Sequence, residues 1–166
     1  MSSMVDIIPY GAIENAFTLA ASFVIQNEDI INKLILLDGD RYITPEEKVQ
    51  QINKKLTGTE IDADEKRDAA LSIIQEFILP EGISPEQFIH DMIIKSFPEE
   101  HEMYTAALEI KAVSDTHEWV YGICEKLGEE IPSIIREVFI YAWEDEAFQT
   151  YLEQIYNWLE LKRKNT

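Results

Sequence analysis

The chain has 166 residues, of which 46% are hydrophobic and 28% are charged, a composition typical of a globular protein. Its 6 glycines, 6 prolines and single cysteine argue against a disordered chain, a turn-rich all-β fold and a disulfide framework. The 14 basic and 32 acidic side chains give a formal net charge of −18. This charge repels nucleic acid and anionic membranes and favours a partner with a basic surface, although solubility alone also accounts for it.

Apolar residues recur at helical spacing along almost the whole chain, and no segment alternates convincingly at period two. The spacing predicts helices near residues 13–35, 49–56, 70–78, 88–97, 103–110, 120–127, 131–142 and 148–159. The connections between these segments are short, and no linker or low-complexity stretch interrupts them. We therefore predict an all-α protein, a single-domain compact bundle of about seven to eight helices over residues 1–166.

The first residues, MSSMVDIIPYG, contain no basic side chain before their apolar part, so we expect no signal peptide. The longest nearly apolar run, residues 16–25, is too short to span a bilayer. We expect no membrane association and a cytoplasmic location.

Residues 36–47, LLDGDRYITPEE, place Asp38, Asp40 and Glu47 at three ligand positions of a calcium-binding EF-hand loop. However, Leu36 occupies the first ligand position and Arg41 occupies the position that requires glycine. Two essential features of such a loop are therefore missing. Whether these acids or the histidines bind a metal is left open.

Helix capping explains the second half of this stretch better. Thr44 followed three residues later by an acid is a capping box, and proline stands at the first helical position. The same pattern recurs at Ile61–Glu65 and Ile83–Gln87, and Asp115–Glu118 has the spacing of a fourth box. We therefore expect these segments to start helices.

Side chains suited to catalysis are few. No phosphate-binding glycine loop, nucleophile elbow or paired CxxC occurs. The histidines His90, His101 and His117 lack a metal-ligand spacing, and we expect them to be solvated beside acids; Glu86 and His90 share a helix face. Cys124 lies on an apolar stripe and is expected to be a buried structural thiol whose pKa neighbouring carboxylates raise.

The last third of the chain carries the most suggestive pattern. Nine of the 17 aromatic residues lie between Trp119 and Trp158, beside acidic clusters at residues 129–130 and 144–146. Exposed rings anchor protein interfaces and carboxylates steer basic partners, whereas buried rings would only fill the core. The candidate partner-binding residues are Trp143, Glu144, Asp145, Glu146, Tyr151 and Trp158.

We therefore predict an acidic, non-enzymatic protein-binding module without a cofactor. Its concrete form would be a stoichiometric inhibitor, of the immunity-protein, antitoxin or phage anti-defence type, that covers a basic, nucleic-acid-handling partner and does not bind nucleic acid itself. Two alternatives stay open: a helical scaffold or chaperone-like module, and a metal-dependent helical-bundle enzyme in which histidines and carboxylates converge.

Overall fold

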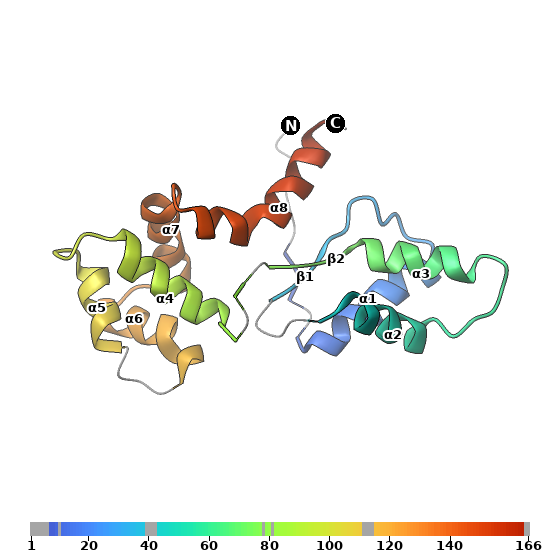
Figure 1. Cartoon of the computed structure of the whole chain (residues 1–166), viewed down its shortest axis with the longest axis horizontal. Helices are drawn as coiled ribbons and strands as arrows, with labels where there is room; N and C mark the ends of the chain where they lie inside the picture. The colour runs from blue at the N-terminus through green and yellow to red at the C-terminus, as the bar shows by residue number, and fades with distance from the viewer. Residues whose placement is uncertain are drawn as a thin grey trace. The chain divides into compact units, whose positions relative to one another are not determined.

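A computed structural model describes residues 7–9, 11–38, 43–77, 79–80, 82–110 and 115–164, apart from the side chains of Gln154 and Lys162 (Figure 1). In these residues the elements are α1 (Ile13–Ile25), β1 (Ile35–Leu37), α2 (Pro45–Lys55), α3 (Ala63–Ser72), β2 (Ile74–Glu76), α4 (Pro85–Ser96), α5 (Glu102–Ile110), the 3-10 helix η1 (Thr116–Glu118), α6 (Trp119–Leu127), α7 (Ile131–Ala142) and α8 (Glu146–Lys164). The predicted all-α class is confirmed, because helices dominate the described residues and the strands form only one two-stranded sheet.

Contacts along the chain define two compact units. Unit 1 comprises Met1–Leu37 and Ile43–Gln75, and unit 2 comprises Asp38–Tyr42 and Glu76–Thr166. Each unit has its own cluster of buried apolar side chains. The single domain predicted over residues 1–166 stays a prediction.

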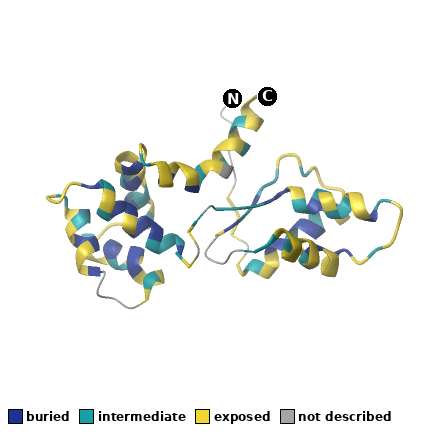
Figure 2. Cartoon of the chain, viewed as in Figure 1, coloured by how far each residue is buried: buried dark blue, intermediate teal, exposed yellow. Residues whose placement is uncertain are grey.

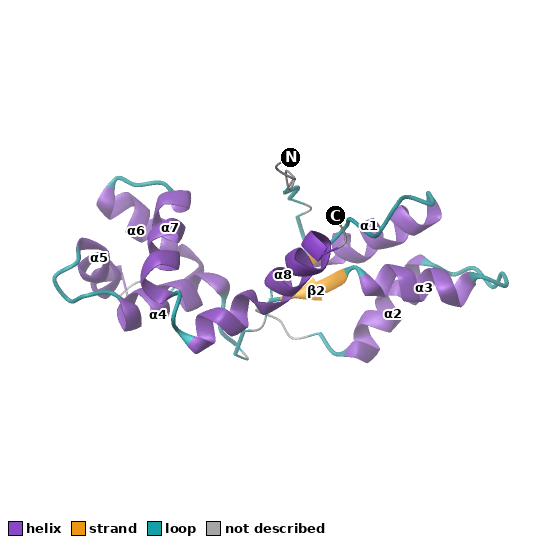
Figure 3. Cartoon of the chain, turned by 90° about the horizontal axis from the view of Figure 1, so that it is seen from above, coloured by secondary structure: helices purple, strands orange, loops and turns teal. Residues whose placement is uncertain are grey.

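Unit 1 is built around α1. This helix contacts α2, α3 and β1, and its buried residues Ala16, Phe17, Ala20, Ala21 and Val24 recur at helical spacing. The small alanine side chains allow neighbouring helices to approach closely. Strands β1 and β2 pair in this unit, and next to β2 the Ile35 amide donates a hydrogen bond of 2.8 Å to the Ile73 carbonyl. Strand β2 directly follows α3 (Figure 3).

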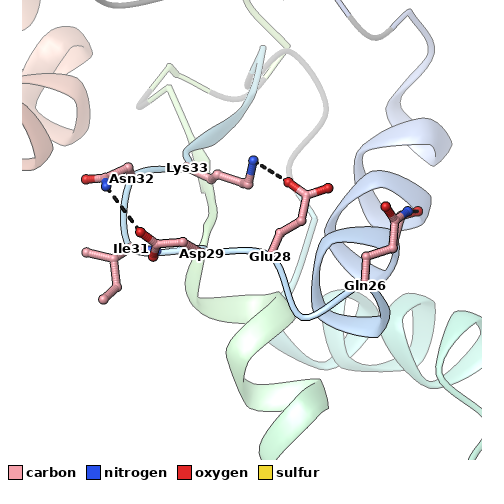
Figure 4. A network of polar contacts seen from close by, with 7 residues as sticks. Gln26, Glu28, Asp29, Ile31, Asn32 and Lys33 are labelled. Atoms are coloured by element: carbon pink, nitrogen blue, oxygen red, sulfur yellow. Dashed lines mark hydrogen bonds and ion pairs between the residues drawn. The ribbon is translucent and has the colours of Figure 1, made fainter.

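Helix α1 ends at Ile25, so the predicted continuation of this helix to residue 35 is wrong. Asn27 follows with a φ of 51°, in the left-handed region that asparagine tolerates at helix ends. The Asp29 carboxylate then accepts a hydrogen bond from the Ile31 amide at 3.0 Å, and Lys33 pairs with Glu28 at 2.7 Å (Figure 4). These contacts turn the chain from α1 into β1.

The helix predicted over residues 70–78 is also wrong in its second half. Helix α3 ends at Ser72, and Ile74 begins strand β2. The β-branched pair Ile73–Ile74 has little preference for a helix and packs well in a strand. A short apolar run fits both periods, and here pairing with β1 selects the strand.

Two of the predicted helix starts form as expected. At α2, the Thr44 hydroxyl accepts from the Glu47 amide at 3.1 Å, and the Glu47 carboxylate accepts from the Thr44 amide at 3.0 Å. The capping box is thus complete. At α4, the Ser84 hydroxyl accepts from the Gln87 amide at 3.2 Å, which is one of the two hydrogen bonds of the predicted box.

The other two start differently. Asp62 precedes α3 without a side-chain cap, so the box predicted there is wrong. Its carboxylate instead pairs with Lys66 at 2.9 Å, a contact between half-exposed groups. The Asp115 carboxylate accepts from the His117 amide at 3.0 Å and caps the short helix η1.

Unit 2 places α4 against α5, α6, α7 and η1. The largest fully buried apolar side chains of this unit come from four different helices and are Ile93, Ile123, Ile134, Val138 and Phe148. Figure 2 shows the buried positions on the inner faces of these helices, while their outer faces are exposed. The opposite faces of α7 and α8 carry the candidate site.

Candidate functional site

The turn between α7 and α8 presents part of the predicted partner-binding set to solvent. Trp143 is 46% exposed, and Glu144 and Glu146 are exposed. The Trp143 ring lies over Phe139, with 6.4 Å between ring centroids and 25° between planes. Among the described residues, neither Glu144 nor Glu146 forms an ion pair, so both carboxylates are available to a basic partner.

Asp145, between these two acids, stabilises the fold. Its side chain is only 12% exposed and pairs with Lys95 of α4. One carboxylate oxygen accepts from the Ala147 amide at 2.9 Å and from the Phe148 amide at 3.2 Å, which makes Asp145 the N-cap of α8. The hydrogen bond from Lys95 and those two amides lower the pKa of Asp145 despite its burial.

Tyr151 is a core residue of unit 2, so the structure does not support its prediction as an exposed anchor. It is 8% exposed, and its ring stacks on Phe77 and tilts against Phe88, at centroid distances of 4.5 and 4.7 Å. Burial, with smaller effects of Glu86 and Asp38, raises the pKa of Tyr151 to about 12. Trp158, the last predicted anchor, is half-buried on α8.

An apolar groove of about 410 Å³ opens beside these residues in unit 2. Its walls come from α4, α6, α7 and α8, and nearly all of its lining is aliphatic or aromatic. Ile131, Ile135 and Phe139 line it from α7, and Leu152 lines it from α8. Its volume lies within the range of ligand-binding clefts.

Helix α7 forms the groove because it has two apolar rows. Ile134, Val138 and Ala142 are fully buried in the core. Ile131, Ile135, Phe139 and Trp143 follow a second row with a spacing of four, and they range from half-buried to 46% exposed. Ile131 and Ile135 of this row pack only partly against the core, so part of the second row remains apolar surface open to solvent.

The groove carries acidic side chains on and next to its walls. Glu86 of α4 is part of the lining, and its carboxylate oxygen lies 3.2 Å from Nδ1 of His117, within hydrogen-bonding distance. Tyr121, which is 62% exposed, also lines the groove and lies one turn before the exposed Glu125 on α6. The sequence prediction missed both Glu86 and Tyr121 as site residues, and the spacing of four along α7 was the signal that could have located the groove.

No protein-family model, no curated protein and no solved structure matches this chain.

The three histidines do not converge, and no group of three or more potential metal ligands occurs among the described residues. The expectation that His90 is solvated is wrong, because it is fully buried. Its Nε2 donates to the Ala107 carbonyl at 3.0 Å, and its ring packs on Trp119 at 4.4 Å. His90 and Glu86 share α4, but Glu86 contacts His117 instead.

In the stretch considered as a calcium loop, Glu47 is engaged in the capping box of α2. Asp38 is exposed, and Asp40 lies outside the described residues. The structure thus gives Glu47 a role in starting a helix, as the capping interpretation predicted.

Cys124 is buried at 8% exposure, as predicted. Burial, more than the nearby Glu129, raises the pKa of its thiol. A thiol in this setting is a weak nucleophile, which favours a structural role. Within the described residues, no helix combines the length and apolar character needed to cross a membrane.

Proposed function

We propose that the chain acts by binding another protein that presents a basic surface. The observation that supports this most directly is the second apolar row that begins on α7, where the exposed Phe139 and Trp143 adjoin Glu144 and Glu146, whose carboxylates form no ion pair with any described residue. Aromatic side chains supply large apolar contact area with few rotatable bonds, and they dominate the energetics of interfaces.

Charge supports the choice of a basic partner. Residues 99–161 contain 3 basic and 15 acidic side chains, and this region includes α6, α7 and most of α8. A surface of one sign accelerates the encounter with a surface of the opposite sign and repels partners of the same sign. The charge therefore steers a basic partner, and the aromatic side chains hold it.

The narrower form of this proposal is a stoichiometric inhibitor of a nucleic-acid-handling protein. Such a protein has a basic surface shaped for phosphates, and carboxylates that cover it would compete with nucleic acid. A complex of one to one stoichiometry that added DNA or RNA dissociates would support this form. A complex that nucleic acid leaves intact would restrict the proposal to protein binding.

The test is capture of the partner from the native host, followed by binding kinetics of the purified pair. The variant Glu144→Lys/Glu146→Lys should slow association on the order of tenfold at low salt, and the effect should shrink as salt rises. The matched control is Glu60→Lys/Asp68→Lys, which changes the net charge equally at two exposed acids of unit 1. Equal association rates for both variants, or no partner in the host, would contradict the proposal.

One observation favours a self-associating scaffold as the second candidate. Tyr156 and Leu159 of α8 are three residues apart on one face of the helix, and they are 57% and 41% exposed. Apolar side chains that cluster on an exposed helix are common at interfaces between subunits. Light scattering at several concentrations separates the candidates: a mass that rises with concentration supports the scaffold, and a constant monomer mass excludes it.

A further inference from the structure

The groove in unit 2 has the form of a binding site for a helix. Its α7 wall is a ridge of side chains spaced by four, Ile131, Ile135 and Phe139, and apart from Phe77 its other lining residues also come from helices. Ridges with this spacing interdigitate with the side chains of a packed helix. A partner helix with apolar residues at i, i+3, i+4 and i+7 would therefore complete the packing.

The margins of the groove determine the charge of the occupant. Glu86 is in the lining, and Glu125 lies one turn from Tyr121 on the exposed side of α6. The groove thus has one carboxylate in its lining and a second within one helical turn, and an occupant with lysine or arginine beside its apolar stripe complements them.

We propose that this groove binds a basic amphipathic helix of a partner protein. The proposal rests on the proposed function and adds the binding site and the secondary structure of the ligand. A second copy of this chain is the poorer occupant, because each copy carries a net charge of −18 and like charges oppose association. Apolar side chains of the partner helix enter the groove, and its basic side chains pair with the carboxylates at the margin.

Three labelled synthetic peptides of equal length test the proposal by fluorescence anisotropy with the full chain. The first is a leucine–lysine peptide with leucine at helical spacing. The second is its scramble, which keeps charge and composition but loses the apolar face. The third replaces lysine with glutamate. We expect the first peptide to bind about tenfold more tightly than the scramble, equivalent to one well-packed apolar anchor, and the third not to bind.

Two pairs of matched variants locate the site. Tyr121→Ser removes a ring that lines the groove, and Tyr156→Ser removes a ring of similar exposure that does not line it, 62% against 57%. Tyr121→Ser should lower the affinity for the leucine–lysine peptide about tenfold, and Tyr156→Ser should leave this affinity unchanged. The second pair tests the charge. Glu86→Gln keeps an oxygen that can contact His117, and it should weaken binding of the leucine–lysine peptide and reduce the salt dependence of that binding. Glu99→Gln changes an exposed acid that does not line the groove, and it should leave both quantities unchanged.

Each contrary result has a distinct meaning. Equal affinity for the amphipathic peptide and its scramble overturns the helix-binding groove but leaves a charge-driven binding function standing. Equal affinity for the glutamate peptide overturns the charge selection. Absence of binding by all three peptides, or equal effects of Tyr121→Ser and Tyr156→Ser, overturns the groove as the site. Failure of the proposed function is detected separately, in the kinetics of the captured partner.

Discussion

Asp145 offers the clearest test of how the candidate site is built, because its side chain makes contacts within the fold, whereas its two neighbours are proposed to bind the partner. The perturbation is Asp145→Ala, with Asp145→Asn as the matched control. Alanine removes both the cap of α8 and the ion pair with Lys95. Asparagine keeps an oxygen that can accept from the Ala147 and Phe148 amides, and it loses only the charge.

The magnitude follows from these contacts. Loss of an N-cap typically costs about 1 kcal/mol. Lys95 is 60% exposed, so solvent screens its pair with Asp145, and the pair contributes at most about 1 kcal/mol. We therefore expect Asp145→Ala to lower the free energy of unfolding by roughly 1.5 kcal/mol and Asp145→Asn by about 0.5 kcal/mol.

Urea unfolding followed by tryptophan fluorescence provides the assay. All three tryptophans, Trp119, Trp143 and Trp158, lie in unit 2, so the signal reports the unit that contains Asp145. Because Trp143 is close to the substitution, far-UV circular dichroism of the same samples should show the same midpoint shift in the part of its signal that unit 2 contributes. Equal destabilisation by alanine and asparagine would refute the capping role, and no destabilisation by either would refute both contacts.

The pH dependence has a definite sign. The pKa of Asp145 is lowered in the folded chain, first by the hydrogen bond from Lys95. Its contribution is therefore present above the ordinary aspartate pKa of about 3.9 and is lost as pH falls through the lower folded value. The stability difference between the wild-type chain and Asp145→Asn should shrink over this acidic range, because asparagine does not titrate.

Three further predictions concern other residues. Tyr151 should resist ionisation until pH about 12 in a tyrosinate absorbance titration. Because its pKa is raised in the folded chain, its contribution to stability is complete below pH about 10 and is lost as pH rises through the folded value. Tyr151→Phe should not show this loss. Cys124 should react with a thiol reagent at neutral pH far more slowly in the folded chain than in urea, because burial raises its pKa and restricts access. Thr44→Ala should destabilise α2 by about 1 kcal/mol, seen as faster hydrogen exchange of its amides, whereas Thr44→Ser should exchange like wild type.

The accuracy of the sequence prediction depended on how local each interaction is. The capping box of Thr44 and Glu47 was predictable, because both hydrogen bonds join residues three apart. Strand β2 was not, because Ile73 and Ile74 fit a helical period and only pairing with Ile35, distant in the chain, selects the strand. Asn27 adopts a left-handed conformation just after α1. Asparagine tolerates this conformation but does not require it, so the residue alone did not predict where the helix ends.

Burial of aromatic side chains was the harder problem for the candidate site. Tyr151 and Trp143 both lie at the edges of apolar stripes in the sequence. Tyr151 becomes buried because Phe77 and Phe88 meet it from elsewhere in unit 2, whereas Trp143 has Phe139 of its own helix as its ring partner and stays 46% exposed. Periodicity gives the face of a helix on which a ring lies, but the packing partners determine whether solvent reaches it.

In the acidic turn, likewise, the sequence alone does not distinguish the roles of three adjacent carboxylates. Glu144, Asp145 and Glu146 are equivalent as a run of acids in the sequence. Once α8 begins at Glu146, however, Asp145 occupies the N-cap position, where a short carboxylate can reach the amides of the first turn. The same geometry leaves the longer side chains on either side exposed. Replacing Asp145 should therefore affect stability first, while replacing Glu144 and Glu146 should affect binding, and only measuring both quantities on each variant separates the two roles.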